Sequence, residues 1–159
     1  MVAASLEIEP LSIGSGLPAT IAALQFSFWG ALTGYGSAAD YEQFLRCAAR
    51  SRQLPIILIA RRGATFLGSV NLLACEMTAR PELSPWMAQL FVVDSERGRG
   101  IGNALIGASI SRLAELSFRR VHLYTSGTLP AYYAALGWKP IEEVEYLGKL
   151  RTIMAFDLL

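Results

Sequence analysis

The segment Arg97-Gly98-Arg99-Gly100-Ile101-Gly102 is the most informative part of the sequence, because it joins an apolar run, Trp86 to Val93, to a stretch with helical spacing that reaches Phe118. A strand followed by a helix is predicted, and the start of the helix presents backbone N–H groups and a positive dipole to an anion. The glycines let the backbone approach that anion closely, and Arg97 and Arg99 add positive charge. The segment therefore predicts a phosphate or pyrophosphate site.

Two other kinds of phosphate-binding loop match this segment poorly. The P-loop of nucleoside triphosphatases requires Lys-Ser or Lys-Thr after its glycines, whereas Asn103-Ala104 follows Gly102. A dinucleotide-binding fold requires a third glycine where Leu105 stands, and an acid about twenty residues further on, where residues 122–125 supply none. The remaining alternative is a glycine-rich turn whose arginines are only solvated.

The rest of the chain predicts strands interleaved with helices. The expected strands are residues 6–9, 55–60, 64–77, 86–93, 121–124, 138–145 and 152–158. The expected helices begin near Pro18, Ser37, Ile101 and Leu129, and Ser37 with Asp40 resembles a capping box. This order predicts an α/β fold, with a mixed sheet of about seven strands and helices on both faces, formed by a single domain over residues 1–159.

The composition excludes several classes of function. Fourteen basic and thirteen acidic residues give a formal net charge of +1, so no long-range field favours nucleic acid or an anionic membrane. Cys47 and Cys75 are the only cysteines, which indicates a reducing compartment, and the pattern predicts both as core thiols. No second His or Cys lies at ligand spacing from His122, so no metal site is expected.

One stretch, Leu11 to Ala39, contains no charged residue and is long enough to cross a bilayer. Its glycines, Pro18 and Gln25 interrupt it, so a short helix flanked by loops is expected instead. The start of the chain, Met1 to Glu7, lacks the basic residues and apolar run of a secretory signal. We therefore expect a cytoplasmic protein with no membrane partner, and the low charged fraction is compatible with a homodimer.

Two motifs give the chain a resemblance to the GNAT superfamily of N-acetyltransferases. The family signature is Gln or Arg, two residues, Gly, one residue, and Gly or Ala, and Arg97, Gly100 and Gly102 match it. A second family element, a Tyr with a Gly and an aromatic residue shortly after it, is matched by Tyr133 with Gly137-Trp138. The resemblance implies a GNAT-like, mostly antiparallel sheet, and it is faint in the first third of the chain.

The resemblance also implies acetyl-CoA as the co-substrate, with no metal. In the family, the pantetheine arm of the cofactor lies along the strand before the glycine segment, and backbone amides of that segment hold the pyrophosphate. Ser126 stands where the family frequently has an Asn that contacts the arm, and its hydroxyl is the candidate substitute. The cofactor-binding residues expected on this basis are Phe91, Val92, Val93, Arg97, Gly98, Arg99, Gly100, Ile101, Gly102, Asn103 and Ser126.

The resemblance places one candidate catalytic residue, Tyr133, where family members often carry the general acid that protonates the departing CoA thiolate. The alternative is an aromatic residue that packs beside Trp138, and Tyr132 takes the role if the register differs by one. No motif fixes the general base. The candidates are Glu76, Glu82, Glu96 and His122, each with a solvated or packed role as the alternative.

The family builds its acceptor site from three loops, which here are residues 26–36, 78–86 and 146–149. These loops are rich in rings, namely Phe26, Phe28, Trp29, Tyr35, Trp86 and Tyr146, and Glu82 is their one acid. They predict an acceptor with an apolar or aromatic part; the alternative is that the rings fill the core or a dimer contact. The resemblance implies an N-acetyltransferase that moves an acetyl group from acetyl-CoA to a primary amine of a small molecule or peptide by direct attack. The alternative function is a non-catalytic acyl-CoA-binding sensor or scaffold of the same fold.

Overall fold

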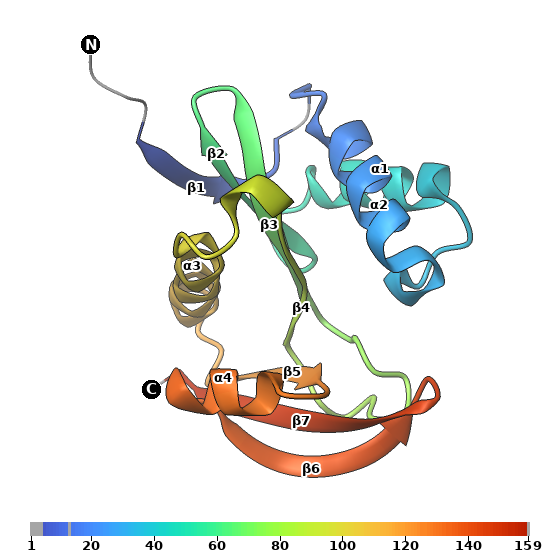
Figure 1. Cartoon of the computed structure of the whole chain (residues 1–159), viewed down its shortest axis with the longest axis vertical. Helices are drawn as coiled ribbons and strands as arrows, with labels where there is room; N and C mark the ends of the chain where they lie inside the picture. Colours follow the sequence, from blue (N-terminus) through green and yellow to red (C-terminus); the bar gives the residue numbers. More distant parts are fainter. Residues whose placement is uncertain (1–4, 13, 159) are drawn as a thin grey trace. The chain divides into compact units, whose positions relative to one another are not determined.

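Strands and helices follow one another along the chain in the predicted order (Figure 1). The computed structural model describes residues 5–12 and 14–158. The strands are β1 (Leu6–Pro10), β2 (Ile56–Arg62), β3 (Thr65–Leu73), β4 (Trp86–Val92), β5 (Arg120–Thr125), β6 (Lys139–Tyr146) and β7 (Lys149–Asp157). The helices are α1 (Leu17–Trp29), α2 (Ala38–Ala48), α3 (Ile101–Glu115) and α4 (Leu129–Ala135), with the 3-10 helices η1 (Gly30–Thr33) and η2 (Asp94–Glu96).

The strands form one seven-stranded sheet in the order β1-β2-β3-β4-β5-β7-β6. The pairs β1/β2, β2/β3, β5/β7 and β6/β7 are antiparallel, whereas β4 and β5 run parallel, with Trp86 opposite His122. This sheet confirms the predicted α/β class with a mixed, mostly antiparallel sheet.

The contacts divide the chain into two compact units, each of which is described by itself. Unit 1 comprises Met1–Leu72 and Gln89–Ala108, and unit 2 comprises Leu73–Ala88 and Ser109–Leu159. The boundary runs through β4 and α3, so each of these elements belongs partly to both units. The single domain expected over residues 1–159 stays a prediction.

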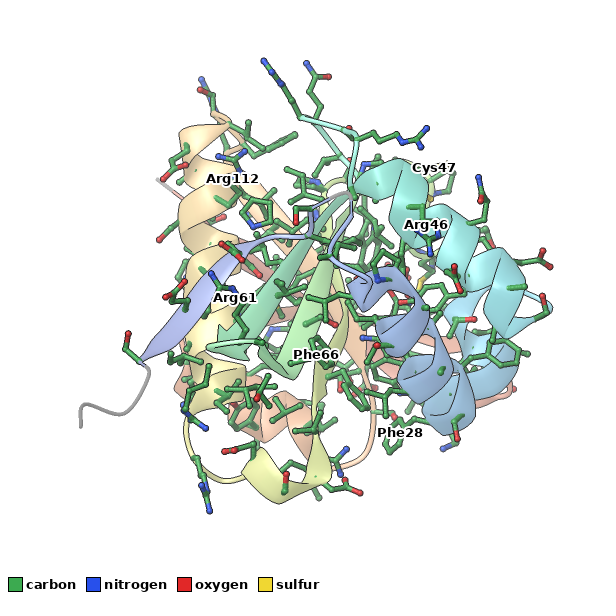
Figure 2. The ribbon with its side chains drawn as sticks, turned by 90° about the horizontal axis from the view of Figure 1, so that it is seen from above. Phe28, Arg46, Cys47, Arg61, Phe66 and Arg112 are labelled. Atoms are coloured by element: carbon green, nitrogen blue, oxygen red, sulfur yellow. The ribbon has the colours of Figure 1, made fainter. Side chains whose placement is uncertain are left out.

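Unit 1 is built on the hairpin of β2 and β3, to which β1 adds an antiparallel edge strand. Arg61 of β2 holds this edge in place, because its guanidinium forms ion pairs of 2.6 Å with both Glu7 and Glu9 of β1 (Figure 2). Helices α1 and α2 cover one face of these strands, and the first half of α3 lies on the other face (Figure 1). The helices expected on both faces of the sheet are therefore present in unit 1.

The core of unit 1 lies between the strands and the helices α1 and α2. Ser37 caps α2, since its side chain accepts a hydrogen bond of 3.1 Å from the backbone N–H of Asp40, as the capping pattern predicts. Tyr41 and Leu45 on α2 and Ile21 on α1 are completely buried. Each such apolar side chain contributes about 1.5–3 kcal/mol when it leaves water, so this cluster fixes both helices on the sheet.

The uncharged stretch over residues 11–39 folds largely into α1 and η1. Helix α1 has 13 residues and buries only one side, on which Ile21 and Gln25 lie, while Leu24 and Phe28 are exposed. Across residues 5–12 and 14–158, no helix combines the length and the apolar character needed to span a membrane.

Unit 2 contains β5, β6 and β7, the start of β4, the second half of α3, and the helix α4, which lies against β6. Its core includes Trp86, Met77 and Ile153, all fully buried. A second aromatic group joins Trp138 to Phe156, with ring centroids 5.6 Å apart. These contacts hold α4 and its C-terminal turn on the β6–β7 ribbon.

The prediction that both cysteines are core thiols is wrong, because Cys47 and Cys75 are exposed. Cys47 lies on the solvent side of α2, whose buried side is already taken by residues such as Tyr41 and Leu45 (Figure 2). Cys75 lies outside the sheet, because β3 ends at Leu73 and not at residue 77 as the apolar run suggested. Both thiols are unpaired.

The approach of β4 to β3 depends on Gly68. A Cβ atom on Gly68 would lie 2.5 Å from the carbonyl oxygen of Phe91, 3.3 Å from Cα of Val92 and 3.3 Å from Cδ1 of Leu105. Two of these three atoms belong to the backbone of β4, which cannot rotate away as a side chain can. Any side chain at position 68 must therefore displace the strand that precedes the glycine segment.

Replacement of Gly68 by alanine is expected to lower the free energy of unfolding by about 1–3 kcal/mol, the usual cost of overpacking. Urea denaturation measures this change. The matched control is Gly107→Ala, since Gly107 lies in α3 and a Cβ there meets no atom within 4 Å. That variant should gain about 0.5–1 kcal/mol, and equal stability of Gly68→Ala and wild type would contradict the close approach.

Candidate functional site

The glycine segment turns the end of β4 into the start of α3, as the sequence predicts. Gly98 and Gly100 have φ angles of 77° and 86°, in the left-handed region that glycine adopts without steric cost. A Cβ at either position would meet no atom within 4 Å. Backbone conformation therefore requires these glycines, and the space beside them is open to a ligand.

Two arginines of the segment are held by local partners in unit 1. The guanidinium of Arg97 donates to the carbonyl oxygen of Val92 at 3.0 Å and pairs with Asp94 at 2.8 Å. It also lies over the ring of Phe28, 5.3 Å from the centroid. Arg99 pairs with Glu96 at 3.4 Å and is largely exposed. The loop therefore carries positive charge, and an anion that binds there competes with the carboxylates of Asp94 and Glu96.

The structure gives Glu96, one of the candidate bases, a different role. Its carboxylate lies 3.1 Å from Arg62 and 3.4 Å from Arg99, and its side chain is only 14 % exposed. Two guanidinium groups share its charge, so Glu96 ties the loop to β2.

The strand residues expected to line the pantetheine arm lie directly before the loop. The backbone N–H of Val93 donates to the carbonyl of Leu67 at 2.9 Å, and the carbonyl of Val92 accepts from Arg97. Side-chain Cγ2 of Val92 lies 3.8 Å from the place of a Cβ on Gly102. Two of the expected backbone groups therefore have partners in the protein, which the sequence did not reveal.

The second family-like element, Tyr133 with Gly137-Trp138, forms the C-terminal cap of α4 in unit 2. The N–H of Trp138 donates to the carbonyl of Tyr133 at 3.1 Å, and the N–H of Gly137 donates to the carbonyl of Ala134 at 3.0 Å. Gly137 has a φ of 99°. These two bonds and the left-handed glycine define a Schellman motif. The helix cap therefore explains the spacing between Tyr133 and Gly137-Trp138 without any catalytic role for Tyr133.

The side chain of Tyr133 is buried within unit 2. Its ring makes edge-to-face contacts with Tyr132 and Trp138, at centroid distances of 5.2 and 6.0 Å. Burial raises the pKa of Tyr133 to about 12, so the hydroxyl stays protonated at neutral pH. Tyr133 therefore packs against aromatic neighbours, as the alternative interpretation predicts. Its hydroxyl also keeps the proton that a general acid needs.

His122 is buried on β5 beside the ring of Trp86, at a centroid distance of 5.6 Å. Its Nδ1 lies 3.1 Å from the carbonyl oxygen of Pro85, and since a carbonyl only accepts, Nδ1 carries the proton. Burial lowers the pKa of His122 below its usual value, with the Pro85 contact opposing this change. His122 is therefore a neutral imidazole at pH 7.

The other candidate residues of unit 2 are Glu76, Glu82 and Ser126, and none of them belongs to a sequence motif of this chain. Glu82 is exposed, and Glu76 lies beside Tyr124, whose pKa is raised to about 12 by burial first and by Glu76 second. Ser126 occupies the turn between β5 and α4 and is half-buried. In the part of the chain that the structure describes, no group of three His, Cys, Asp or Glu side chains could hold a metal ion.

The predicted site residues fall into two groups. Unit 1 brings together the end of β4, the glycine segment and the first turn of α3, which include residues 91–93 and 97–103. Ser126 and Tyr133 belong to unit 2, on the β5–α4 connection.

Sequence reasoning missed a buried polar network in unit 1, formed by Gln25, Tyr41, Ser69, Asn71 and Gln89. The available signal was the occurrence of polar residues inside apolar runs, such as Gln25 in α1 and Ser69 and Asn71 in β3. The sequence alone does not tell which of these polar residues meet.

Comparison with known proteins agrees with this geometry. The model of the Acetyltransferase (GNAT) family matches residues 21–138, and no curated protein sequence matches the chain. Among solved structures, an aminoglycoside 6'-N-acetyltransferase complexed with coenzyme A has a TM-score of 0.75 at 14% identity, over 96% of this chain and 97% of that one. The aminoglycoside 6'-N-acetyltransferase from Enterococcus faecium has a TM-score of 0.73 at 16% identity, over 96% and 97%. The spermidine/spermine N-acetyltransferase from Vibrio cholerae has a TM-score of 0.70 at 17% identity, over 97% and 95%. At these identities the structures bear on the fold alone.

Proposed function

Since the chain belongs to the GNAT family of acetyltransferases, we propose that it transfers an acetyl group from acetyl-CoA to a primary amine by direct attack. The observation that carries this proposal is the glycine segment, which has left-handed glycines and opens a 15-residue helix directly after a strand. A helix start of this kind is a general site for phosphate groups. The three solved structures named above, two for aminoglycosides and one for spermidine and spermine, support an amine as the acceptor.

In the proposed complex, the pyrophosphate of CoA binds at residues 97–103, where the helix dipole and two arginines favour an anion. The pantetheine arm runs along Phe91–Val93, and Ser126 provides a hydroxyl contact to it. The guanidinium of Arg97 also lies over the ring of Phe28. A bound phosphate therefore competes with this ring for the same guanidinium. No metal takes part in this proposal.

The proposed chemistry needs one proton donor. The amine nitrogen attacks the thioester carbonyl, a C–N bond forms and the C–S bond breaks, and the proton that nitrogen loses balances the one that sulfur gains. Tyr133 supports this step as a hydroxyl that stays protonated, and its pKa of about 12 lies above that of a free thiol, about 8.5. Tyr133 therefore donates a hydrogen bond to the developing thiolate, and complete proton transfer follows as the amine releases its own proton.

The acceptor is a primary amine of a small molecule or a peptide. The exposed rings near the end of α1, such as Phe28, support an acceptor with an apolar part. Two unpaired thiols support a reducing, cytoplasmic location.

The variant Gly100→Glu is expected to weaken acetyl-CoA binding by on the order of a hundredfold, because a carboxylate near the pyrophosphate repels it by a few kcal/mol. Calorimetric titration measures the dissociation constant. Gly100→Ala is the matched control, since it imposes the same backbone strain at φ 86° without the charge, and it should weaken binding much less. Equal affinities of wild type and Gly100→Glu would place the cofactor elsewhere.

The variant Tyr133→Phe is expected to lower kcat by about 10²–10⁴-fold, the usual contribution of an acid, with acetyl-CoA affinity unchanged. The matched control is Tyr132→Phe, which removes the neighbouring hydroxyl and should keep kcat. Because the pKa of Tyr133 is about 12, the Tyr133-dependent part of the rate should stay constant from pH 7 to 10. An unchanged kcat in Tyr133→Phe would leave Tyr133 with its packing role only.

A further inference from the structure

Five neutral polar side chains form a buried network in unit 1, between α1, α2, β3 and β4. The Nδ2 group of Asn71 donates to the hydroxyl of Tyr41 at 3.1 Å, and Tyr41 donates to Oε1 of Gln25. Nε2 of Gln25 donates in turn to Oγ of Ser69 at 2.5 Å. The second branch runs from Nδ2 of Asn71 to Oε1 of Gln89 at 3.1 Å. These bonds fix the direction of the donors of Asn71, Tyr41 and Gln25.

One atom of the network lacks a partner. Oδ1 of Asn71 is buried and accepts no hydrogen bond, although the residue is only 1 % exposed and both Nδ2 protons are used. An unsatisfied buried acceptor is destabilising and calls for an explanation. A hydrogen-bond donor that reaches Oδ1 would remove this destabilisation.

Gln89 connects the network to the surface of unit 1. The other four members are buried, whereas Gln89 is half-buried and has a φ of 47°, a conformation that costs a non-glycine residue energy. Such strain persists only where the surrounding contacts hold it, and here the bond from Asn71 fixes the amide. Backbone strain at a polar residue in a strand is typical of a ligand site.

Five of the six acids of unit 1 are paired with arginines. Glu7 and Glu9 pair with Arg61, Glu42 pairs with Arg46, Asp94 pairs with Arg97, and Glu96 pairs with Arg62 and Arg99. Asp40, the sixth acid of the unit, is exposed in the first turn of α2, where the helix dipole favours it. The single histidine belongs to unit 2. An ammonium ion beside Gln89 would thus compete with arginines for most carboxylates of unit 1, and burial of an unpaired charge is strongly unfavourable.

Aromatic rings lie next to the network on the same face of the strands. Phe91, two residues after Gln89, packs in one core cluster with Tyr41. The ring of Phe91 makes edge-to-face contacts with Phe28 and Trp29, at 5.9 and 5.8 Å between centroids. Phe28 is 58 % exposed at the C-terminal end of α1 (Figure 2). Gln25 and Trp29, four residues apart on α1, lie on one side of that helix and connect the network to the rings.

We propose that Gln89, oriented by Asn71, is the specificity-determining residue of an acceptor subsite in unit 1, and that this subsite takes an uncharged aromatic amine. The inference rests on the proposed function, because it names the acceptor of the same acetyl transfer. The ring of the amine contacts Phe28, Trp29 and Phe91, and its N–H groups face the amide network. An arylamine fits this subsite, since it is unprotonated at neutral pH and donates hydrogen bonds without bringing a charge.

Two isomeric amines test this proposal, p-toluidine and benzylamine. They have the same atoms and similar shapes, but at neutral pH p-toluidine is uncharged and benzylamine is an ammonium ion. For the wild-type protein, kcat/KM is expected to be at least about tenfold higher for p-toluidine, because the ammonium ion must give up hydration or a proton to bind. A wild-type preference for benzylamine would overturn the proposal without any variant.

The variant Gln89→Glu gives the second measurement. Glutamate is nearly isosteric, and its oxygen still accepts the bond from Asn71, so the fold and the acetyl-CoA affinity should be kept. The added carboxylate pairs with the ammonium ion, and we expect KM for benzylamine to fall and the preference to shift toward benzylamine by about tenfold or more. Gln43→Glu, the same change at an exposed position of α2, is the matched control and should leave the preference unchanged.

An unshifted preference in a Gln89→Glu protein that binds acetyl-CoA like wild type would overturn the role of Gln89. The proposed function fails in a different way, namely if acetyl-CoA does not bind or if no amine of any class accepts the acetyl group, and the inference then fails with it. Rapid acetylation of spermidine or benzylamine with none of p-toluidine would keep the proposed function and overturn the arylamine subsite.

Discussion

The left-handed backbone at Gly98 and Gly100 is the constraint on which the rest of the candidate site depends. It lets β4 end and α3 begin within a few residues, so that a helix start and two arginines meet at one point of unit 1. The approach of β4 to β3 at Gly68 fixes where that point lies. The left-handed turn and the close approach both depend on backbone sterics. A Cβ atom at Gly98, Gly100 or Gly68 would disfavour them.

Most acids of unit 1 are neutralised by a nearby arginine, and this shapes the chemistry open to the unit. Arg97 is an example, because its one guanidinium contacts the carbonyl of Val92, the carboxylate of Asp94 and the ring of Phe28. The same side chain thereby joins the glycine segment to the aromatic residues at the end of α1. The interior polar groups are amides and hydroxyls, so recognition there relies on hydrogen bonds and ring contacts.

Much of the fold could be predicted from the sequence, because it depends on local patterns. Apolar runs of strand length, the cap at Ser37 and the glycine segment are all determined within a few residues, and each is confirmed. Cys47 and Cys75 were misassigned, because the choice between the two sides of a helix and the end of a strand depend on packing. The contact of Gln25 with Ser69 joins residues 44 positions apart, which no local pattern can reveal. The roles of Tyr133 and Ser126 stay predictions, and the cap formed by Gly137 and Trp138 shows that a family-like spacing can have a structural cause.

The most direct test of the central claim is to follow the release of free CoA thiol when the wild-type protein is incubated with acetyl-CoA and a panel of primary amines. We expect thiol release that depends on the amine and is matched, mole for mole, by the acetylated amine in mass spectrometry. Tight binding of acetyl-CoA without any amine-dependent thiol release would contradict it, and the chain would then be an acyl-CoA-binding module of the same fold.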